Sequence, residues 1–248
     1  FLLLMAETGC ASAEDLDAEV GNSDDPSGVV DVVQLEHEAL TESSGLAVSA
    51  RRPGHFWTHN DSGSKARLYA FDAEGNRTAE RRLQLIGAND WEDLCGYIDA
   101  GEPRLLIADC GDNDRRRESI DLHLMKEPDP HDSDSVDQIS TIEVRYPDGS
   151  HDCEAVAVDT VRKQIILVTK TFLPSCGIYV IPLPDHNQLP RHSEVTATRL
   201  GSLPLPMVTA MDIDSVNGDV WLVSYFQAFQ FKARDRHEDL VAQLKELP

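Results

Sequence analysis

The stretch LCGYIDAGEPRLLIAD, residues 94–109, decides the fold. Two short apolar runs, residues 94–98 and 104–109, flank the turn Gly101-Glu102-Pro103. Short apolar strands joined by a Gly/Pro turn are typical of an antiparallel hairpin. The same pattern recurs along the chain with a period of about 50 residues, which indicates an internal repeat.

Grouped by this period, the chain contains four sets of four expected strands. The first set covers residues 45–49, 55–59, 67–72 and 80–85, and the second covers 94–98, 104–109, 121–125 and 139–146. The third set covers residues 155–159, 164–169, 177–181 and 195–200, and the fourth covers 211–214, 219–225, 229–232 and 240–244. The last of these lies within residues 237–247, a stretch that has a helical 3.6-residue pattern. Such units predict an all-β fold, a β-propeller of four-stranded antiparallel blades. A two-sheet sandwich is the alternative.

The segments outside these sets complete the predicted architecture. Residues 29–40 are expected to form a strand that closes the ring by pairing with the last blade. Residues 126–138, rich in Pro, Asp and Ser, are expected to be a loop insertion in the second blade. Because the chain stops soon after the fourth set, we expect a ring truncated from five or more blades.

The composition excludes several classes of partner. The 248-residue chain has 44 Asp and Glu against 22 Lys and Arg, a formal net charge of −22. This charge repels nucleic acid and anionic membrane surfaces, so we expect no nucleic-acid partner. No apolar run is long enough for a transmembrane span. With 41% hydrophobic residues, the composition is that of a globular protein.

The N-terminal sequence indicates export. The apolar run FLLLMA, residues 1–6, precedes Cys10, and an acidic stretch rich in small residues, 11–28, follows it. This order resembles the end of a bacterial lipoprotein signal. We therefore interpret residues 1–28 as a signal-peptide remnant and disordered acidic tether, with Cys10 as a candidate lipid anchor. Residues 29–248 would form the propeller, outside the cytoplasm: secreted, periplasmic or lipid-anchored in the cell envelope.

The remaining cysteines leave three disulfide pairings open. They are Cys95, Cys110, Cys153 and Cys176, and none forms a C-x-x-C pair, so zinc is not indicated. Cys110 and Cys153 fall on loops of adjacent blades and are the favoured disulfide. Cys95 falls in an innermost strand and is expected to be a buried thiol.

Most of the unusual residues fall on loops at one face of the predicted propeller. The loops that lead into each innermost strand and those between the second and third strands open on this face, the channel mouth. The candidate metal ligands there are Asp90, Glu92, Asp93, Asp109, Asp112, Asp152, Glu154 and Asp212. Crowded carboxylates repel unless a cation or hydrogen-bond donors compensate, so we expect a Ca²⁺ site. The alternative compensation is a set of internal donors: Lys170, His59, His151, Arg116 and Arg117. A further interpretation is that the acids brace loops as hydrogen-bond acceptors.

The same loops supply candidate binding and catalytic residues. The candidate ligand-binding residues are Glu42, Trp57, His59, Asn60, Asp61, Trp91, Asn113, Arg116 and Lys170. The two tryptophans would stack on a sugar ring or flat ligand, or else lie in the core between blades. The candidate catalytic residues are His59, Glu154 and Lys170, with His59 or Glu154 as general base. No phosphate-binding glycine loop and no nucleophile elbow accompanies them.

Several of these motifs together resemble a known family. In chain order they are ESSGL (42–46), WTHNDSG (57–63), DWED (90–93), GDN (111–113) and YPDG (146–149). They are similar to a family of exported bacterial β-propeller proteins, often lipoproteins, of unestablished activity. More distantly, the arrangement is similar to calcium-dependent propeller hydrolases of the phytase-like and lactonase-like types. The resemblance implies an exported propeller.

Two functions follow as hypotheses. The first is an extracytoplasmic binding or scaffold protein with a calcium-binding acidic face at the channel mouth, whose partner is a carbohydrate, a protein or a phosphorylated small molecule. The alternative is a metal-dependent hydrolase of the phosphoesterase or lactonase type that uses the same face. The first is favoured because the spacing of the residues assembles no set of nucleophile, base and orienting group.

Overall fold

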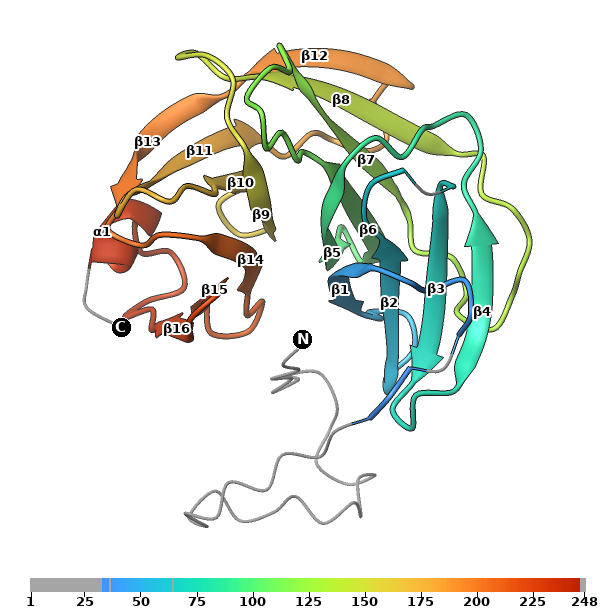
Figure 1. The fold of residues 1–248 in the computed structure, drawn as a ribbon. Helices are drawn as coiled ribbons and strands as arrows, with labels where there is room; N and C mark the ends of the chain where they lie inside the picture. The colour runs from blue at the N-terminus through green and yellow to red at the C-terminus, as the bar shows by residue number, and fades with distance from the viewer. Residues whose placement is uncertain (1–32, 36, 64, 246–248) are drawn as a thin grey trace.

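The computed structural model describes residues 33–35, 37–63 and 65–245. Within them, four small antiparallel sheets are arranged as a four-bladed β-propeller, and Figure 1 shows the blades around a common centre. The predicted fold class is therefore confirmed. The predicted signal remnant, acidic tether and Cys10 anchor lie outside the described residues. No helix in the described part of the chain is long and apolar enough to cross a membrane.

Each blade is one sheet. Blade 1 contains β1 (Ser43–Val48), β2 (His55–Asn60), β3 (Arg67–Asp72) and β4 (Arg77–Arg82). Blade 2 contains β5 (Trp91–Asp99), β6 (Glu102–Asp109), β7 (Ile120–Lys126), β8 (Ile139–Arg145) and β12 (His192–Thr196). Blade 3 contains β9 (Cys153–Asp159), β10 (Gln164–Thr169), β11 (Cys176–Pro182) and β13 (Thr198–Leu203). Blade 4 contains β14 (Val208–Ile213), β15 (Val220–Ser224) and β16 (Ala228–Phe231), and helix α1 (Leu240–Lys245) follows it.

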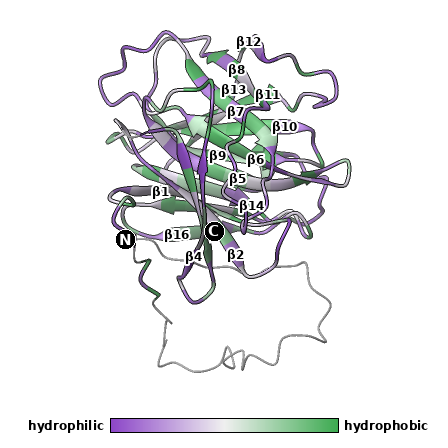
Figure 2. Ribbon diagram, turned by 90° about the vertical axis from the view of Figure 1, so that its right-hand side faces the viewer, coloured by the Kyte–Doolittle hydropathy of each residue, from purple (hydrophilic) through white to green (hydrophobic). Residues whose placement is uncertain are grey.

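The hydrophobic core lies between neighbouring blades. The innermost strands β1, β5, β9 and β14 contact one another in that order around the centre (Figure 1). In β6, Leu105 and Ile107 pack toward blade 1, whereas the alternate residues Leu106 and Ala108 pack toward blade 3. Because both faces of such a strand are buried, its middle residues 105–108 are all apolar, and Figure 2 shows hydrophobic residues concentrated in the strands.

The predicted strand 195–200 is two strands that belong to different blades. β12 pairs in parallel with β8 at the outer edge of blade 2, and β13 pairs with β11 in blade 3. The prediction of one strand is therefore wrong. Three strands of blade 3, β9, β10 and β11, lie between β8 and β12 in the sequence, and a parallel pair with so long a crossover leaves no local pattern.

The prediction of a fourth strand at 240–244 is also wrong, because these residues belong to α1. Leu240 and Leu244 are four positions apart, so both lie on one face of the helix, and both are buried in the core between blades 3 and 4. The Gln243 amide donates to the carbonyls of Gly218 and Phe231, which fixes α1 against blade 4. In the described residues, blade 4 thus has three strands.

The segment before β1 runs along blade 1. Its described parts, 33–35 and 37–40, form no strand. The His37 ring lies 5.1 Å from the Tyr69 ring, and the Asn60 amide donates to the Ala39 carbonyl at 2.7 Å. The prediction that 29–40 pairs with the last blade is wrong for these parts, while residues 29–32 lie outside the described residues.

The insertion between β7 and β8 joins blade 2 to blade 1. Glu127 accepts hydrogen bonds from the Trp57 indole and the Arg51 amide, both at 2.9 Å, and from the Ser49 hydroxyl. Further along, Val136 forms a bridge with Leu83. The segment is a loop as predicted, and it also fixes the relative position of the two blades.

Candidate metal centre

A β-bulge recurs near the start of the innermost strand in every blade. The extra residues, which have no partner in the pairing register, are Gly45, Glu92, Glu154 and Thr209. A bulge bends the strand and redirects the side chain of the extra residue, and bulges are common beside functional sites. Blades 2 and 3 therefore each place a glutamate at the channel mouth.

Three carboxylates from blades 1 and 2 converge at this mouth. Asp61 follows β2, Asp90 precedes β5 and Glu92 is the bulge residue, and one carboxylate oxygen from each lies within 4.8 Å of the others. We call them the three-carboxylate group. Glu92 is only 9% exposed, and its carboxylate has no hydrogen bond or ion pair with any described residue. Such a carboxylate lacks the compensation that burial normally requires.

The pKa values of the group reflect this lack of compensation. Burial, followed by the charges of Asp61 and Asp90, raises the pKa of Glu92 to about 8. Burial and the Asp61 charge also raise the pKa of Asp90. A bound cation would remove both the repulsion and the desolvation penalty.

Gly111 permits the close approach of two of these acids. A Cβ atom at this position would lie 2.4 Å from both Asp90 Oδ2 and Glu92 Oε1. The Gly111 amide also donates to the Asp90 carbonyl at 3.1 Å. Only glycine leaves room for both carboxylates here.

The equivalent glutamate of blade 3 is neutralised within the protein. Lys170, which is buried, forms an ion pair with Glu154, and its Nζ lies 3.5 Å from Asp152. Lys170 directly follows β10, and the residue that directly follows β6 in blade 2 is Cys110. The bulge glutamate of blade 2 therefore has no lysine partner, although the two blades repeat the same geometry.

Most of the other predicted metal ligands brace loops. Backbone amides donate to Asp93 from Leu94 and Val156, to Asp109 from Asn89 and Asp90, to Asp112 from Arg116 and Arg117, and to Asp152 from Asp112. Arg117 also forms an ion pair with Asp109 at 2.8 Å. Asp212 is exposed on β14 and accepts from the Ile213 amide. Of the eight predicted ligands, the structure brings Asp90 and Glu92 together with Asp61.

The candidate ligand-binding residues are divided between the core and the surface. Trp57 and Trp91 are buried between blades 1 and 2, and the Asn60 amide oxygen accepts from the Thr41 and Glu42 amides. The side chains of Glu42, Asn113 and Arg116 are exposed near the mouth. The tryptophans thus take the core position that the sequence left as the alternative to ligand stacking.

His59, a candidate general base, is fully buried. Its Nδ1 lies 3.0 Å from the Asn60 carbonyl and its Nε2 lies 3.4 Å from the Asp93 carbonyl. Burial lowers the pKa of His59 to about 4, so the ring is neutral at pH 7. Both ring nitrogens face main-chain carbonyls, and the catalytic roles of His59, Glu154 and Lys170 remain predictions.

The cysteines are buried thiols. Cys110 and Cys153 are adjacent as expected, since the Cys110 thiol donates to the Cys153 carbonyl at 2.9 Å. The disulfide predicted between them is wrong, because Cys95, Cys110, Cys153 and Cys176 are all free. The Cys153 sulfur instead lies 3.5 Å from the Val168 carbonyl. Cys95 is the buried thiol that was predicted.

The structure also reveals two features that the sequence reasoning missed. Glu143 on β8 and His192 and Glu194 on β12 bring potential ligand atoms within 4.8 Å of one another. Their proximity depends on the parallel pairing of β8 and β12, so no local sequence signal could have predicted it. Arg145 forms an ion pair with Glu143, which partly neutralises this second group.

The second feature is an exposed apolar patch on the channel-mouth face. It consists of Phe172 and Leu173, 87% and 67% exposed, and Tyr225 and Phe226, 64% and 75% exposed. The two pairs lie on the loops after β10 and β15, both of which hydrogen-bond to Met207. Exposed apolar patches of this kind mark binding surfaces.

No protein-family model and no curated protein matches the chain. Among solved structures it is similar to the Myceliophteria thermophila Cps50 (Swd1) β-propeller domain, with a TM-score of 0.42 and 11% identity over 77% of this chain and 54% of that one. A chain of a nidogen/laminin complex gives a TM-score of 0.49 and 10% identity over 80% of this chain and 62% of that one. The Dos1 propeller gives a TM-score of 0.36 and 8% identity over 78% of this chain and 56% of that one. The chain spans less than two thirds of each of these chains, and the similarities are distant.

Proposed function

We propose that this propeller is a binding scaffold whose channel mouth holds a calcium ion at the three-carboxylate group. The observation that carries the proposal is the buried Glu92 carboxylate, which approaches Asp61 and Asp90 and has no donor among the described residues. In the same protein, Lys170 neutralises the corresponding Glu154. A cation is the compensation that the blade 2 geometry requires.

The donor set favours calcium over a transition metal. All three side chains offer oxygen, and no imidazole or thiol belongs to the group. Carboxylate oxygens suit hard cations, and Ca²⁺ takes six to eight oxygen ligands in flexible geometry. Loops that follow or precede strands in two blades can supply such a set without distorting the sheets.

The proposed ligand binds at the apolar patch, on the same face of the propeller as the three-carboxylate group. Tyr225 and Phe226 lie on a loop of blade 4, and Phe172 and Leu173 lie on the neighbouring loop of blade 3. Exposed aromatic rings stack on sugar rings and anchor protein partners. We therefore propose a carbohydrate or protein ligand, with a phosphorylated small molecule as the third candidate.

The same proposal places the protein outside the cytoplasm. It rests on the apolar run and Cys10 of the N-terminal sequence, which resemble a lipoprotein signal. Calcium sites of extracellular modules bind with dissociation constants of about 10⁻⁴ to 10⁻³ M, which suits a site of only three carboxylates.

Calcium titration calorimetry tests the proposed site. Wild-type protein freed of metal should bind one Ca²⁺ at the mouth, and Asp90→Asn and Glu92→Gln should each weaken binding about tenfold or more, because each removes a charged ligand. Asp114→Asn is the matched control, since Asp114 is an exposed acid outside the group and should leave binding unchanged. Equal affinities in wild type and Glu92→Gln would contradict the proposed site.

A further inference from the structure

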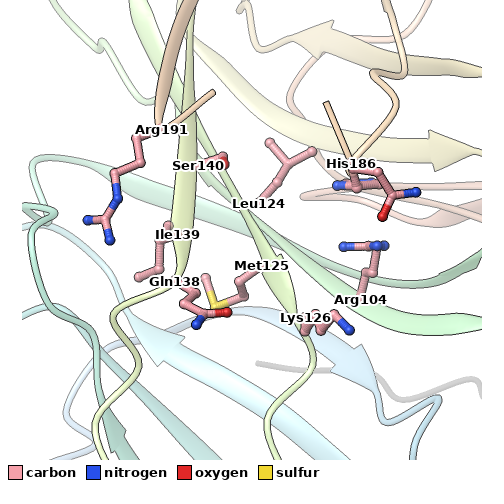
Figure 3. Close-up of a pocket in the computed structure, with 10 residues that line it drawn as sticks. Arg104, Leu124, Met125, Lys126, Gln138, Ile139, Ser140, His186 and Arg191 are labelled. Carbon is pink, nitrogen blue, oxygen red and sulfur yellow. The ribbon is translucent and has the colours of Figure 1, made fainter. Parts of the chain in front are cut away.

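A cavity of about 240 Å³ lies at the end of blade 2 that is remote from the acidic mouth. Strand β6 runs from Glu102 to Asp109; Asp109 braces the loop of the mouth, and Arg104 near the other end lines the cavity. Figure 3 shows Arg104 and Lys126 at one side of the cavity and Arg191 at the opposite side. None of the residues that line it is acidic, in a chain whose net charge is −22.

The Arg104 side chain is almost wholly buried, and its Nε has no hydrogen-bond partner. The residue is only 7% exposed, and Nε is shielded from solvent. No nitrogen of the guanidinium forms a hydrogen bond or ion pair with any described residue. Guanidinium groups remain charged at all physiological pH values, so burial of an unpaired one is strongly unfavourable.

The acids nearest to Arg104 are bound by other cations. Lys163 forms an ion pair with Asp99 at 2.7 Å, and Lys126 forms one with Glu102 at 2.8 Å. Arg104 and Lys126 are also direct cross-strand partners on β6 and β7, an arrangement of like charges that is unfavourable by itself. The protein thus concentrates positive charge here. Asp99 and Glu102 lie within electrostatic range of Arg104 but form their direct ion pairs with the two lysines.

We propose that this cavity binds a small oxyanion, the phosphate or carboxylate group of a small molecule, through the Arg104 guanidinium. The planar guanidinium fork pairs with either group through two parallel hydrogen bonds. Lys126 and Arg191 supply further positive charge, and the Ser140 hydroxyl is a nearby donor. The cavity is smaller than the pockets that hold drug-sized molecules, so the ligand is a small metabolite.

The neighbouring histidine, His186, adds no positive charge to the cavity. His186 Nε2 lies 3.0 Å from the Tyr97 hydroxyl, and burial together with the Arg104 charge lowers the pKa of His186 to about 4. The ring is therefore neutral at pH 7 and bound to Tyr97. Leu124 and Ile139 complete the lining with apolar surface for the remainder of the ligand.

Thermal melts with inorganic phosphate test the proposal. The buffer is freed of metal by a chelating resin, because a soluble chelator is itself a polycarboxylate, and NaCl holds the ionic strength constant. The melting midpoint of wild type should rise with the logarithm of phosphate concentration. Arg104→Met should weaken phosphate binding at least about tenfold, since it removes the bidentate charged donor. The control Arg82→Met removes one exposed arginine of blade 1 and should respond as wild type does.

The same melts without phosphate separate a binding role from a structural one. If Arg104 serves a ligand, Arg104→Met should melt at least as high as wild type in chloride, because an unpaired buried charge is gone. Wild type that responds to neither phosphate nor malonate, or a response that is identical in wild type and Arg104→Met, overturns the proposal. If Arg104→Met does not fold, equilibrium dialysis of radiolabelled phosphate and malonate against wild type and Lys126→Met decides: weaker retention by Lys126→Met supports the proposal, and retention of neither anion by wild type overturns it.

A parallel series with malonate distinguishes the two sources of oxyanion. A response to phosphate alone assigns the cavity to phosphorylated molecules, and a response to malonate alone assigns it to carboxylates. Glu92→Gln should bind phosphate as wild type does, because the three-carboxylate group lies at the other end of the blade. The outcome is therefore independent of the calcium proposal.

Discussion

At the scale of single residues, Glu92 determines the chemistry of the mouth. The bulge in β5 places its carboxylate beside Asp61 and Asp90, and the residue is only 9% exposed. The side chain therefore holds its proton near neutral pH unless a cation replaces that proton. Proton and metal compete for the same oxygens, which couples stability to pH.

In metal-free protein, the free energy of unfolding should fall between pH 7 and pH 9. The pKa of Glu92 is about 8 in the folded state against 4.5 for an unperturbed glutamate, so the folded state binds this proton more tightly and loses stability as it leaves. The Glu92 share of the loss across this window is about 1 kcal/mol. Urea unfolding at both pH values measures it.

Glu92→Gln is the control for that experiment. It retains Asp93, whose pKa burial also raises to about 8, and removes only the Glu92 titration. Its stability should therefore fall less steeply than that of wild type. Equal slopes in the two proteins would contradict the assignment of the titration to Glu92.

Gly111→Ala should weaken calcium binding without unfolding the protein. The added methyl group would displace the carboxylates of Asp90 and Glu92, from which its carbon would be 2.4 Å away. We expect a loss of affinity of about tenfold, because the ligands no longer converge. Calorimetry checks this against Gly87→Ala, where a Cβ atom meets nothing within 4 Å. Affinity equal to wild type would show that Gly111 does not shape the site.

At the scale of elements, the insertion after β7 connects blade 2 to blade 1 through hydrogen bonds. Glu127 binds the Trp57 indole, the Arg51 amide and the Ser49 hydroxyl of blade 1, so its carboxylate is shared between two blades. Each blade is a separate sheet, so side-chain contacts of this kind help to hold neighbouring blades together.

Glu127→Ala should reduce the free energy of unfolding by about 3 kcal/mol, because it leaves buried donors of blade 1 unpaired. Glu127→Gln retains one acceptor oxygen and should cost less. Urea unfolding of both variants checks the order. A loss in Glu127→Ala no greater than that of an exposed control, Glu74→Ala, would contradict the bridging role.

Much of the blade architecture could be predicted from the sequence, because buried strands and Gly/Pro turns are local signals. Residues 67–72 and 164–169 were predicted with the bounds that the structure has. The split between β12 and β13 was missed, since the pairing of β12 with β8 depends on contacts across the intervening strands of blade 3. At 240–244 a strand was predicted although residues 237–247 have a helical periodicity, and α1 follows that periodicity.

The sequence predicted which acids lie at the candidate site, but not which of them approach one another. Asp90 and Glu92 were expected as metal ligands, and Asp61 was expected to bind ligand. The sequence cannot show that Lys170 reaches Glu154 and leaves Glu92 without a cation, because that difference depends on which residue follows the second strand in each blade. Sequence alone likewise gives no sign that the Arg104 Nε is buried without a hydrogen-bond partner.

At the scale of the whole molecule, the two ends of blade 2 carry charges of opposite sign: acidic residues at the mouth and basic residues at the cavity. A net charge of −22 raises the local concentration of cations around the acidic mouth, and salt screens this effect. The cavity at the other end gathers Arg104, Lys126 and Arg191. The propeller thus separates the proposed cation site from the proposed anion site by the length of one blade.

The central claim is that a calcium ion compensates Glu92, and the dependence of the melting midpoint on calcium tests it most directly. The 248-residue chain, stripped of metal, is melted at constant ionic strength over a series of free Ca²⁺ concentrations, with Mg²⁺ as the comparison. The account predicts a midpoint that rises with the logarithm of free Ca²⁺ in wild type, responds less to Mg²⁺, and stays flat in Glu92→Gln. A flat response in wild type, or an equal rise in Glu92→Gln, would contradict it.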